Sequence, residues 1–499
     1  MPNSAPSSVT SLPRWLRAVL IGFAGVAGAA YLITLAAHIS PHAGGADSSG
    51  YLNSARMLGH GKFLTPARTL PGHAATEFGE MTFQPLGFRI QPATGQIAPT
   101  YPIGFPLHLF AAARIAGWHN AAIVVNVVTV LVSGGLFWAL ARRLGLQPIW
   151  AGAGVALLWL CPLFLFSALQ PMSDLLALAW SLAVLYCALR AKDHWAWALA
   201  CGISLGLAVL VRPTNALLAV PVGVALGFHW RSYLAVGLGG LPGAAAFAFY
   251  NWRVYGSPVL TGYGDVSSAF SREFLSHNLA HFARWIPALL SPVIMLVLAA
   301  PFLPAARQRG YGMLAAWWVT LTGFYSFYYN SGETWWYLRF ILPAFPALIL
   351  GSLAVLATSA QAFRVRTRLG LVAVSGVLLF AAGWQIRQIQ HLAVMTFEQG
   401  ERNYPDAAHW AQKNLPANSA IFCLQVSGAF YYYSDFMMVR WDQVAAGQYA
   451  ALHAALAEQQ RPIYAALFPF ETPEALDKIG GHWTKLTTIG QVTFWQRQP

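Results

Sequence analysis

The sequence predicts a polytopic α-helical membrane protein that ends in a small α/β domain. Hydrophobic residues make up 57% of the 499 residues and charged residues only 9%, which lies outside the range of soluble globular proteins. Apolar segments of spanning or nearly spanning length recur between residues 14 and 388. Beyond them, the chain alternates between amphipathic stretches and short apolar stretches, as helices and strands of a folded domain do.

Charge and cysteine content exclude several classes of protein. The net charge is +13, but the basic residues stand singly or in short clusters between apolar segments. This distribution is typical of loops that set membrane topology and not of a nucleic-acid-binding face. The four cysteines, Cys161, Cys187, Cys201 and Cys423, form no disulfide framework or zinc-type pair. We expect them to be small buried apolar side chains.

The first apolar segment runs from about Ala18 to Ala37 and follows Arg14 and Arg17. It is longer than a usual signal-peptide core, so we expect an uncleaved membrane helix whose N-terminus is cytoplasmic, after a disordered lead at residues 1–13. Together with the later segments, it predicts about 11–12 membrane helices. The later apolar segments lie at 101–117, 119–141, 149–169, 172–190, 194–211, 213–229, 232–250, 285–304, 311–329, 338–357 and 369–388.

Basic clusters assign sides to these segments. If the clusters are cytoplasmic, every second loop is basic and the loops between them are not. The clusters are Arg142/Arg143, Arg190/Lys192, Arg231, Arg307/Arg309 and Arg364/Arg366/Arg368. This assignment requires that one of the first three segments does not span. Segment 101–117 is short and contains Pro102, Pro106 and Arg114, so we expect it to be interfacial or re-entrant.

With these sides, the polar loops gather on the outer face. They include the large loop at residues 40–100, which belongs to the membrane part at 14–388, and the C-terminal domain at 389–499. The C-terminal domain contains no glycine-rich phosphate loop, so we predict no bound nucleotide. We therefore look for the functional site on this face.

Asp47 is the first carboxylate of the chain and lies in "GGADSSGY". The two glycines end the first helix, and the following segment places Tyr51, Ala55 and Leu58 on one face, as an interfacial helix would. Two interpretations of Asp47 are open: it caps a helix that begins near Ser48, or it accepts a proton at the membrane surface. The two are compatible if one carboxylate oxygen stays free.

The order of several motifs carries a family resemblance. After Asp47 come "YLNSARMLGHGKF", "YPIGFPLHLF", "RRLG", "PLFLFSALQPMSD", "RPTN", "NWRVYGSPVLTGYG" and "YLRFILPAFPAL". This order resembles the GT-C membrane glycosyltransferases, which include protein O-mannosyltransferases and lipid A aminoarabinose transferases, over roughly residues 14–357. The chain has Asp47-Ser48 where protein O-mannosyltransferases carry an Asp-Glu pair.

The resemblance implies a GT-C type bundle that transfers a sugar from a polyprenyl-phosphate carrier to an acceptor hydroxyl on the outer face of a bacterial cytoplasmic membrane. Asp47 would be the base. The departing lipid phosphate calls for a guanidinium group, and Arg212 and Arg339 are the candidates, although each could instead only snorkel to the interface. The resemblance also implies an active-site role for Asp174, whose alternative is to cap a helix.

Other residues complete the predicted substrate site. Tyr263 lies in the glycine-containing loop "TGYGD" and is expected to bind sugar or phosphate, in a loop that gates entry. Tyr51 is predicted to bind substrate beside Asp47. Glu77 and Glu80 lie in the same outer loop as Asp47 and either join the site or only face solvent.

The sequence leaves open whether the protein needs a divalent metal, and we assign no residue as a metal ligand. The histidines that flank Asp47 are His38, His42, His60 and His73. They form no helical zinc motif. The expected partners are the lipid-linked donor, a lipid, glycan or protein acceptor, and membrane lipids, with no nucleic acid.

Two other functions compete with glycosyl transfer. A transporter or flippase of a lipid-linked or small polar substrate needs ionisable groups near mid-membrane and two related halves. This chain has its charges at segment ends and shows no internal repeat. A non-catalytic assembly protein would act through its C-terminal domain. The sequence favours the enzyme.

Overall fold

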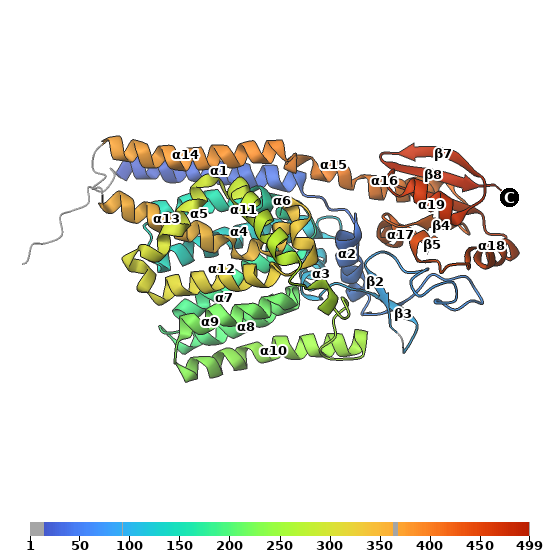
Figure 1. The fold of residues 1–499 in the computed structure, drawn as a ribbon, viewed down its shortest axis with the longest axis horizontal. Coiled ribbons are helices and arrows are strands. Elements are labelled where there is room, and N and C mark those ends of the chain that lie inside the picture. The colour runs from blue at the N-terminus through green and yellow to red at the C-terminus, as the bar shows by residue number, and fades with distance from the viewer. Residues whose placement is uncertain (1–13, 92, 363–367, 499) are drawn as a thin grey trace, which may run out of the picture.

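A computed structural model describes residues 14–91, 93–362 and 368–498. The helix bundle occupies one end of an elongated molecule and a sheet-containing C-terminal domain occupies the other (Figure 1). Helix α2 and two short strands, β2 and β3, lie between them. The lead predicted at 1–13, with Arg364 and Arg366, lies outside the described residues.

Apolar helices form the bundle around one large core of buried side chains. Helices α8 and α10 approach closely because glycines face each other: a Cβ on Gly202 would lie 2.0 Å from the Val236 carbonyl oxygen, and one on Gly243 would lie 2.6 Å from the Gly206 Cα. Small residues allow such contact between membrane helices. The bundle helices are α1 (Arg14–His38), α4 (Ala121–Arg143), α5 (Pro148–Trp159), α6 (Pro162–Ala168), α7 (Ser173–Arg190), α8 (Trp195–Val211), α9 (Ala219–Leu226), α10 (Trp230–Tyr255), α11 (Phe274–Leu290), α12 (Arg309–Tyr325), α13 (Phe345–Ala362) and α14 (Arg368–His391).

Fewer helices than expected meet the requirements of a membrane span. By length and composition, the described residues contain five such helices, or up to seven if each of two bent pairs is one span. The remaining apolar segments form shorter helices among the described residues. Prolines are one reason, since α6 starts at Pro162 after a 63° bend from α5, and the 3₁₀ helix η3 (Pro292–Phe302) follows α11 at 107°. Other segments form helices of 17 residues, such as α8 and α12.

The segment at 101–117 forms α3 (Gly104–Ala116), which has 13 residues. At 1.5 Å per residue it is about 20 Å long, shorter than the ~30 Å hydrocarbon core. It packs against α2 and α4. Its length agrees with the prediction that this segment does not span.

Two basic loops lie on the same side of the bundle. The Asp193 carboxylate is 2.5 Å from Arg143, at the end of α4, and 3.1 Å from Arg190, at the end of α7. Asp174 lies at the opposite end of α7, about 24 Å along the helix axis at 1.5 Å per residue. Arg190, one of the basic residues that we expect on the cytoplasmic side, and the candidate site residue Asp174 therefore lie at opposite ends of α7.

The outer region contains α2 (Ala46–Gly59) and a three-stranded antiparallel sheet in the order β1 (Thr65–Pro66), β3 (Gln96–Pro99), β2 (Phe88–Ile90). The C-terminal domain has a five-stranded mixed sheet in the order β5-β4-β6-β8-β7. Strand β4 is parallel to β5 and β6, while β8 is antiparallel to β6 and β7. The elements of this domain are α16 (Asn403–Asn414), β4 (Ala420–Cys423), α17 (Ser427–Tyr433), β5 (Met437–Arg440), α18 (Tyr449–Glu458), β6 (Ile463–Leu467), α19 (Thr472–Ile479), β7 (Trp483–Ile489) and β8 (Val492–Arg497).

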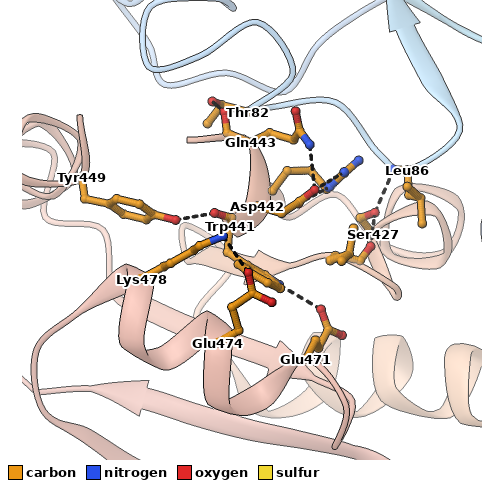
Figure 2. A network of polar contacts seen from close by, with 12 residues as sticks. Thr82, Leu86, Ser427, Trp441, Asp442, Gln443, Tyr449, Glu471, Glu474 and Lys478 are labelled. Atoms are coloured by element: carbon orange, nitrogen blue, oxygen red, sulfur yellow. Dashed lines mark hydrogen bonds and ion pairs between the residues drawn. The ribbon is translucent and has the colours of Figure 1, made fainter. Parts of the chain in front are cut away.

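Hydrogen bonds join the outer loop to the C-terminal domain (Figure 2). The backbone N–H of Leu86 donates to Ser427 Oγ at 2.9 Å, and the Thr82 hydroxyl donates to the Gln443 carbonyl oxygen at 3.1 Å. Inside the domain, the Trp441 indole donates to Glu471 at 2.9 Å. The loop that follows α2 is thus held by a folded domain.

All four cysteines are free and buried, as predicted.

Candidate active site

Asp47 lies in the first turn of α2, and its carboxylate is paired with an arginine. The helix begins at Ala46 after Gly45, so the interpretation of Asp47 as the capping residue of a helix starting near Ser48 is wrong. The positive end of the helix dipole favours a carboxylate at this place. Asp47 Oδ2 accepts a hydrogen bond from Arg339 Nη2 at 2.8 Å.

Arg339 lies in the 3₁₀ helix η6 (Trp335–Phe340) and does not simply snorkel. Its Nη1 lies 3.2 Å from Met172 Sδ, a weak acceptor. Its Nε is buried and has no hydrogen-bond partner among the described residues. Arg339 therefore keeps N–H donors that no strong acceptor among the described residues engages.

Asp174 forms a second carboxylate–guanidinium pair. Helix α7 begins at Ser173 after Met172, so Asp174 is not the capping residue. Its Oδ1 accepts a hydrogen bond from Arg212 Nη1 at 2.5 Å. The Asp174 side chain is only 4% exposed, whereas that of Asp47 is 32% exposed. The Asp174–Arg212 pair is thus buried, and the Asp47–Arg339 pair is open to the cavity.

Tyr51 connects the two carboxylate-bearing helices. Its hydroxyl donates to Ser173 Oγ at 2.8 Å, which joins α2 to the start of α7. Burial raises the pKa of Tyr51, so the phenol stays protonated as a donor. The Tyr51 ring packs at 4.8 Å from that of Tyr101, which contacts Tyr263 edge-on at 6.4 Å.

A cavity of about 1470 Å³ brings six of the predicted site residues together: Asp47, Tyr51, Asp174, Arg212, Tyr263 and Arg339 all line it. Aromatic rings form much of the remaining wall. The cavity is larger than the ~300–1,000 Å³ typical of small-molecule sites. It combines two guanidinium groups with an apolar aromatic surface, and this combination suits an amphipathic anion. The aromatic residues are Tyr101, Phe166, Phe270, Phe274, Phe324, Tyr325, Tyr328, Tyr329, Trp335, Trp336, Tyr337, Phe340, Phe397 and Tyr404.

The structure places Glu77 and Glu80 outside this cavity. Both are exposed in the loop that docks on the C-terminal domain. Glu77 Oε1 is 2.8 Å from His73 Nδ1, and the Glu80 backbone carbonyl accepts a bond from Gln84. These contacts fit the alternative in which the two carboxylates only face solvent.

The C-terminal region, residues 389–499, contributes cavity residues that were not predicted. Glu401, Tyr404 and Gln425 line the same cavity as Asp47. No local motif marks them, because they approach the site only through the docking of the C-terminal domain. A carboxylate in a short amphipathic helix gives no sequence signal that distinguishes it from a solvated one.

The donor set does not fit a divalent cation. Among the described residues, no group of three or more His, Cys, Asp or Glu side chains could hold a metal ion. Asp47 and Asp174 face guanidinium groups instead. The histidines near Asp47 have other neighbours, since His38 and His60 contact backbone carbonyls in their own helices and His42 and His73 contact glutamates. We derive no step through a metal.

Comparisons with known proteins place this arrangement in a known fold. The family model for dolichyl-phosphate-mannose-protein mannosyltransferases matches residues 101–250. No curated protein matches the chain significantly by sequence. The structure is similar to ArnT from Cupriavidus metallidurans bound to undecaprenyl phosphate, with a TM-score of 0.59 and 15% identity over 96% of this chain and 99% of that chain.

Two larger enzymes share the fold over part of their length. The Archaeoglobus fulgidus oligosaccharyltransferase matches with a TM-score of 0.52 and 12% identity over 88% of this chain and 69% of that chain. The mycobacterial arabinofuranosyltransferase AftD matches with a TM-score of 0.54 and 14% identity over 98% of this chain and 40% of that chain. The chain therefore has the fold of the GT-C membrane glycosyltransferases, as its motif order predicted.

Proposed function

We propose that this protein is a glycosyltransferase that moves a sugar from a polyprenyl-phosphate donor to an acceptor hydroxyl on the periplasmic face of the bacterial inner membrane. The observation that carries the proposal is the open Asp47–Arg339 pair in the wall of a large aromatic cavity. The shared fold with ArnT bound to undecaprenyl phosphate supports a lipid-phosphate donor. The acceptor is a lipid, a glycan or a protein.

Asp47 is the proposed general base. The acceptor hydroxyl gives its proton to the Asp47 carboxylate while its oxygen forms a bond to the anomeric carbon. The bond between the anomeric carbon and the phosphate oxygen breaks at the same time, and its electron pair leaves with the polyprenyl phosphate. Asp47 suits this role because 32% of its side chain is exposed and only Oδ2 is engaged by Arg339.

Arg339 is the proposed main phosphate ligand. The donor is a phosphodiester with one negative charge, and the leaving group gains a second charge as the sugar departs. A guanidinium group that is already in place stabilises this developing charge. Arg339 has uncommitted donors for the purpose. Arg212 adds positive charge nearby, since its Nη1 lies 3.5 Å from the Arg339 carbonyl oxygen.

Asp174 and the tyrosines hold the site in shape and contact the substrate. Asp174 fixes Arg212, and Tyr51 ties the base-carrying helix to α7. Tyr263, half-exposed on its loop, faces the cavity and is the proposed contact for the sugar or phosphate. A transporter would use the same cavity without bond cleavage and has no need for a base.

The test is turnover of labelled donors. The purified protein in lipid nanodiscs is given undecaprenyl-phospho-hexoses and undecaprenyl-phospho-pentoses labelled in the sugar, together with a lipid and glycan extract, and label on the acceptor is counted. Asp47→Asn should lower transfer by about 10²–10⁴-fold, the usual contribution of a positioned base, while Glu77→Gln, the same change at a carboxylate outside the cavity, should not. Transfer that survives Asp47→Asn, or vectorial uptake without cleavage in proteoliposomes, would contradict the proposal.

A further inference from the structure

Glu401 is a buried carboxyl group in the cavity wall, and no guanidinium partner pairs with it among the described residues. Glu401 is the last residue of α15 (Phe397–Glu401), just before the C-terminal domain. It is only 9% exposed and lines the cavity together with Tyr404 and Gln425. None of these residues has a part in the mechanism above.

One oxygen of this carboxyl group is unsatisfied. Glu401 Oε2 is buried and has no hydrogen-bond partner among the described residues. Folded proteins rarely leave a buried polar atom in this state unless a water or a ligand completes its bonds. Burial raises the pKa of Glu401 to about 7, against the opposing hydrogen bond from the Gly45 backbone. Near neutral pH the group is therefore able to donate as well as accept a hydrogen bond.

Gly44 makes room for this carboxyl group beside the proposed base. A Cβ on Gly44 would lie 1.6 Å from Glu401 Oε2. The backbone of Gly44 is not left-handed, so space and not conformation favours glycine here. Asp47 follows within three residues. The Glu401 carboxyl group thus packs against the same segment that carries Asp47.

Two neutral polar side chains, Tyr404 and Gln425, lie in the same cavity wall as Glu401. Gln425 Nε2 donates to the Tyr404 hydroxyl at 2.9 Å, which leaves the tyrosine proton and the Gln425 amide oxygen for another partner. Tyr404 is 7% exposed, and burial raises its pKa. A carboxyl, a phenol and an amide in one wall offer alternating donors and acceptors, which match vicinal hydroxyl groups. They offer no fixed positive charge for a phosphate.

We infer that Glu401, Tyr404 and Gln425 form a subsite for the hydroxyl groups of a sugar ring, on the C-terminal side of the cavity. This inference rests on the proposed function and divides the cavity into two parts. The arginine pair receives the lipid phosphate, and the neutral wall receives the sugar. The ring belongs either to the donor or to a glycan acceptor, and both sources present the same hydroxyl chemistry.

The experiment compares sugar-free and sugar-linked lipid. Affinities for undecaprenyl phosphate and for the undecaprenyl-phospho-sugar that the wild type transfers are measured in nanodiscs. The variants are Glu401→Leu, Glu401→Gln and Gly44→Ala, which keeps the carboxyl group but displaces it. Glu398→Leu is the matched control, because Glu398 lies on the same short helix, contacts His42 and Arg402 and does not line the cavity.

If the subsite holds the donor sugar, Glu401→Leu and Gly44→Ala should bind the sugar-linked lipid at least tenfold more weakly and undecaprenyl phosphate unchanged. Glu401→Gln, which keeps a donor and an acceptor, should stay within threefold of the wild type. If the subsite holds the acceptor, donor affinity stays constant and the KM for a methyl glycoside acceptor rises at least tenfold.

Two results would overturn the inference. If donor affinity and acceptor KM are both unchanged in folded Glu401→Leu and Gly44→Ala, Glu401 is only structural, and the proposed function stands. If the wild type binds no sugar-linked lipid more tightly than undecaprenyl phosphate and transfers none, the proposed function fails and the subsite fails with it. Gly44→Ala keeps the test valid if Glu401→Leu does not fold.

Discussion

Two carboxylate–arginine pairs share one cavity, but their surroundings differ. The Asp174–Arg212 pair lies where α7 starts inside the bundle, and the Asp174 side chain is 4% exposed. The Asp47–Arg339 pair joins the outer helix α2 to η6, and the Asp47 side chain is 32% exposed. The two arginines are buried to a similar degree, with 15% of the Arg212 side chain and 16% of the Arg339 side chain exposed. The difference therefore lies in the acids.

This difference in exposure fits a structural role for the Asp174–Arg212 pair and the proposed catalytic role for the Asp47–Arg339 pair. A buried ion pair has lost its hydration, so removal of one partner leaves an uncompensated charge in a medium of low polarity. A carboxylate that still meets water can change partners at small cost. The same two residue types thus serve to hold α7 against α8 in one place and to leave a proton acceptor accessible in the other.

Removal of the acids should show the contrast most strongly. Asp174→Ala should lower the free energy of unfolding by about 3–5 kcal/mol, because Arg212 is left buried and unpaired. Asp47→Ala should lower it by less, about 1 kcal/mol, because Asp47 is partly exposed in the cavity and water that fills its place can solvate Arg339. Denaturant titration in mixed micelles measures both values. Arg212→Met added to Asp174→Ala should recover part of the loss, and equal losses for the two single variants would remove the distinction between the pairs.

Glu401 extends the comparison to a carboxyl group with no arginine. Its pKa of about 7 lies above the ordinary 4.5, so the folded state holds the proton more tightly than the unfolded state. The associated stability is complete below about pH 4.5 and is lost as the pH rises through 7. Relative to Glu401→Gln, the wild type should lose on the order of 3 kcal/mol between pH 4.5 and 8. Parallel pH profiles of the melting temperature would contradict this expectation.

The two arginines should differ in phosphate binding. Arg339→Lys should weaken the binding of undecaprenyl phosphate about tenfold, or about 1.4 kcal/mol, because a lysine cannot hold Asp47 and a phosphate with a planar fork of donors. Arg212→Lys should weaken it about twofold, since Arg212 is already committed to Asp174. Titration of nanodisc-bound protein measures the Kd values. A larger loss at Arg212 would make that arginine the main phosphate ligand.

The smallest effect is expected at the contact between the two regions. Tyr51→Phe removes the hydrogen bond to Ser173 and should cost about 1 kcal/mol of stability, the usual net value of such a bond. Transfer should fall by more than the stability loss accounts for if this bond positions α2 and Asp47. Unchanged turnover in the folded variant would show that the contact between α2 and α7 does not position the base.

Local sequence patterns were enough for most elements. The short apolar stretches "MMVRW" and "RPIYAALF" contain β5 and β6, and "PEALDKIGG" contains most of α19. The short, proline-bearing segment at 101–117 forms the 13-residue α3. These predictions succeed because periodicity, proline and charge act on neighbouring residues. The bends at Cys161 and Ser291, ahead of prolines, were not predicted, because they depend on how the broken helices pack.

The sequence alone determined the membrane class, the C-terminal α/β domain and the position of a single carboxylate just after the first helix. Only the tertiary structure decided which arginine each carboxylate meets, since Asp47 and Arg339 are 292 positions apart in the chain. It also decided that Glu77 and Glu80 lie outside the cavity and that Glu401 lines it. The physical reason is that hydropathy and helix signals are local, whereas pairing and burial of charges depend on contacts between distant segments, which form only when the whole chain has packed.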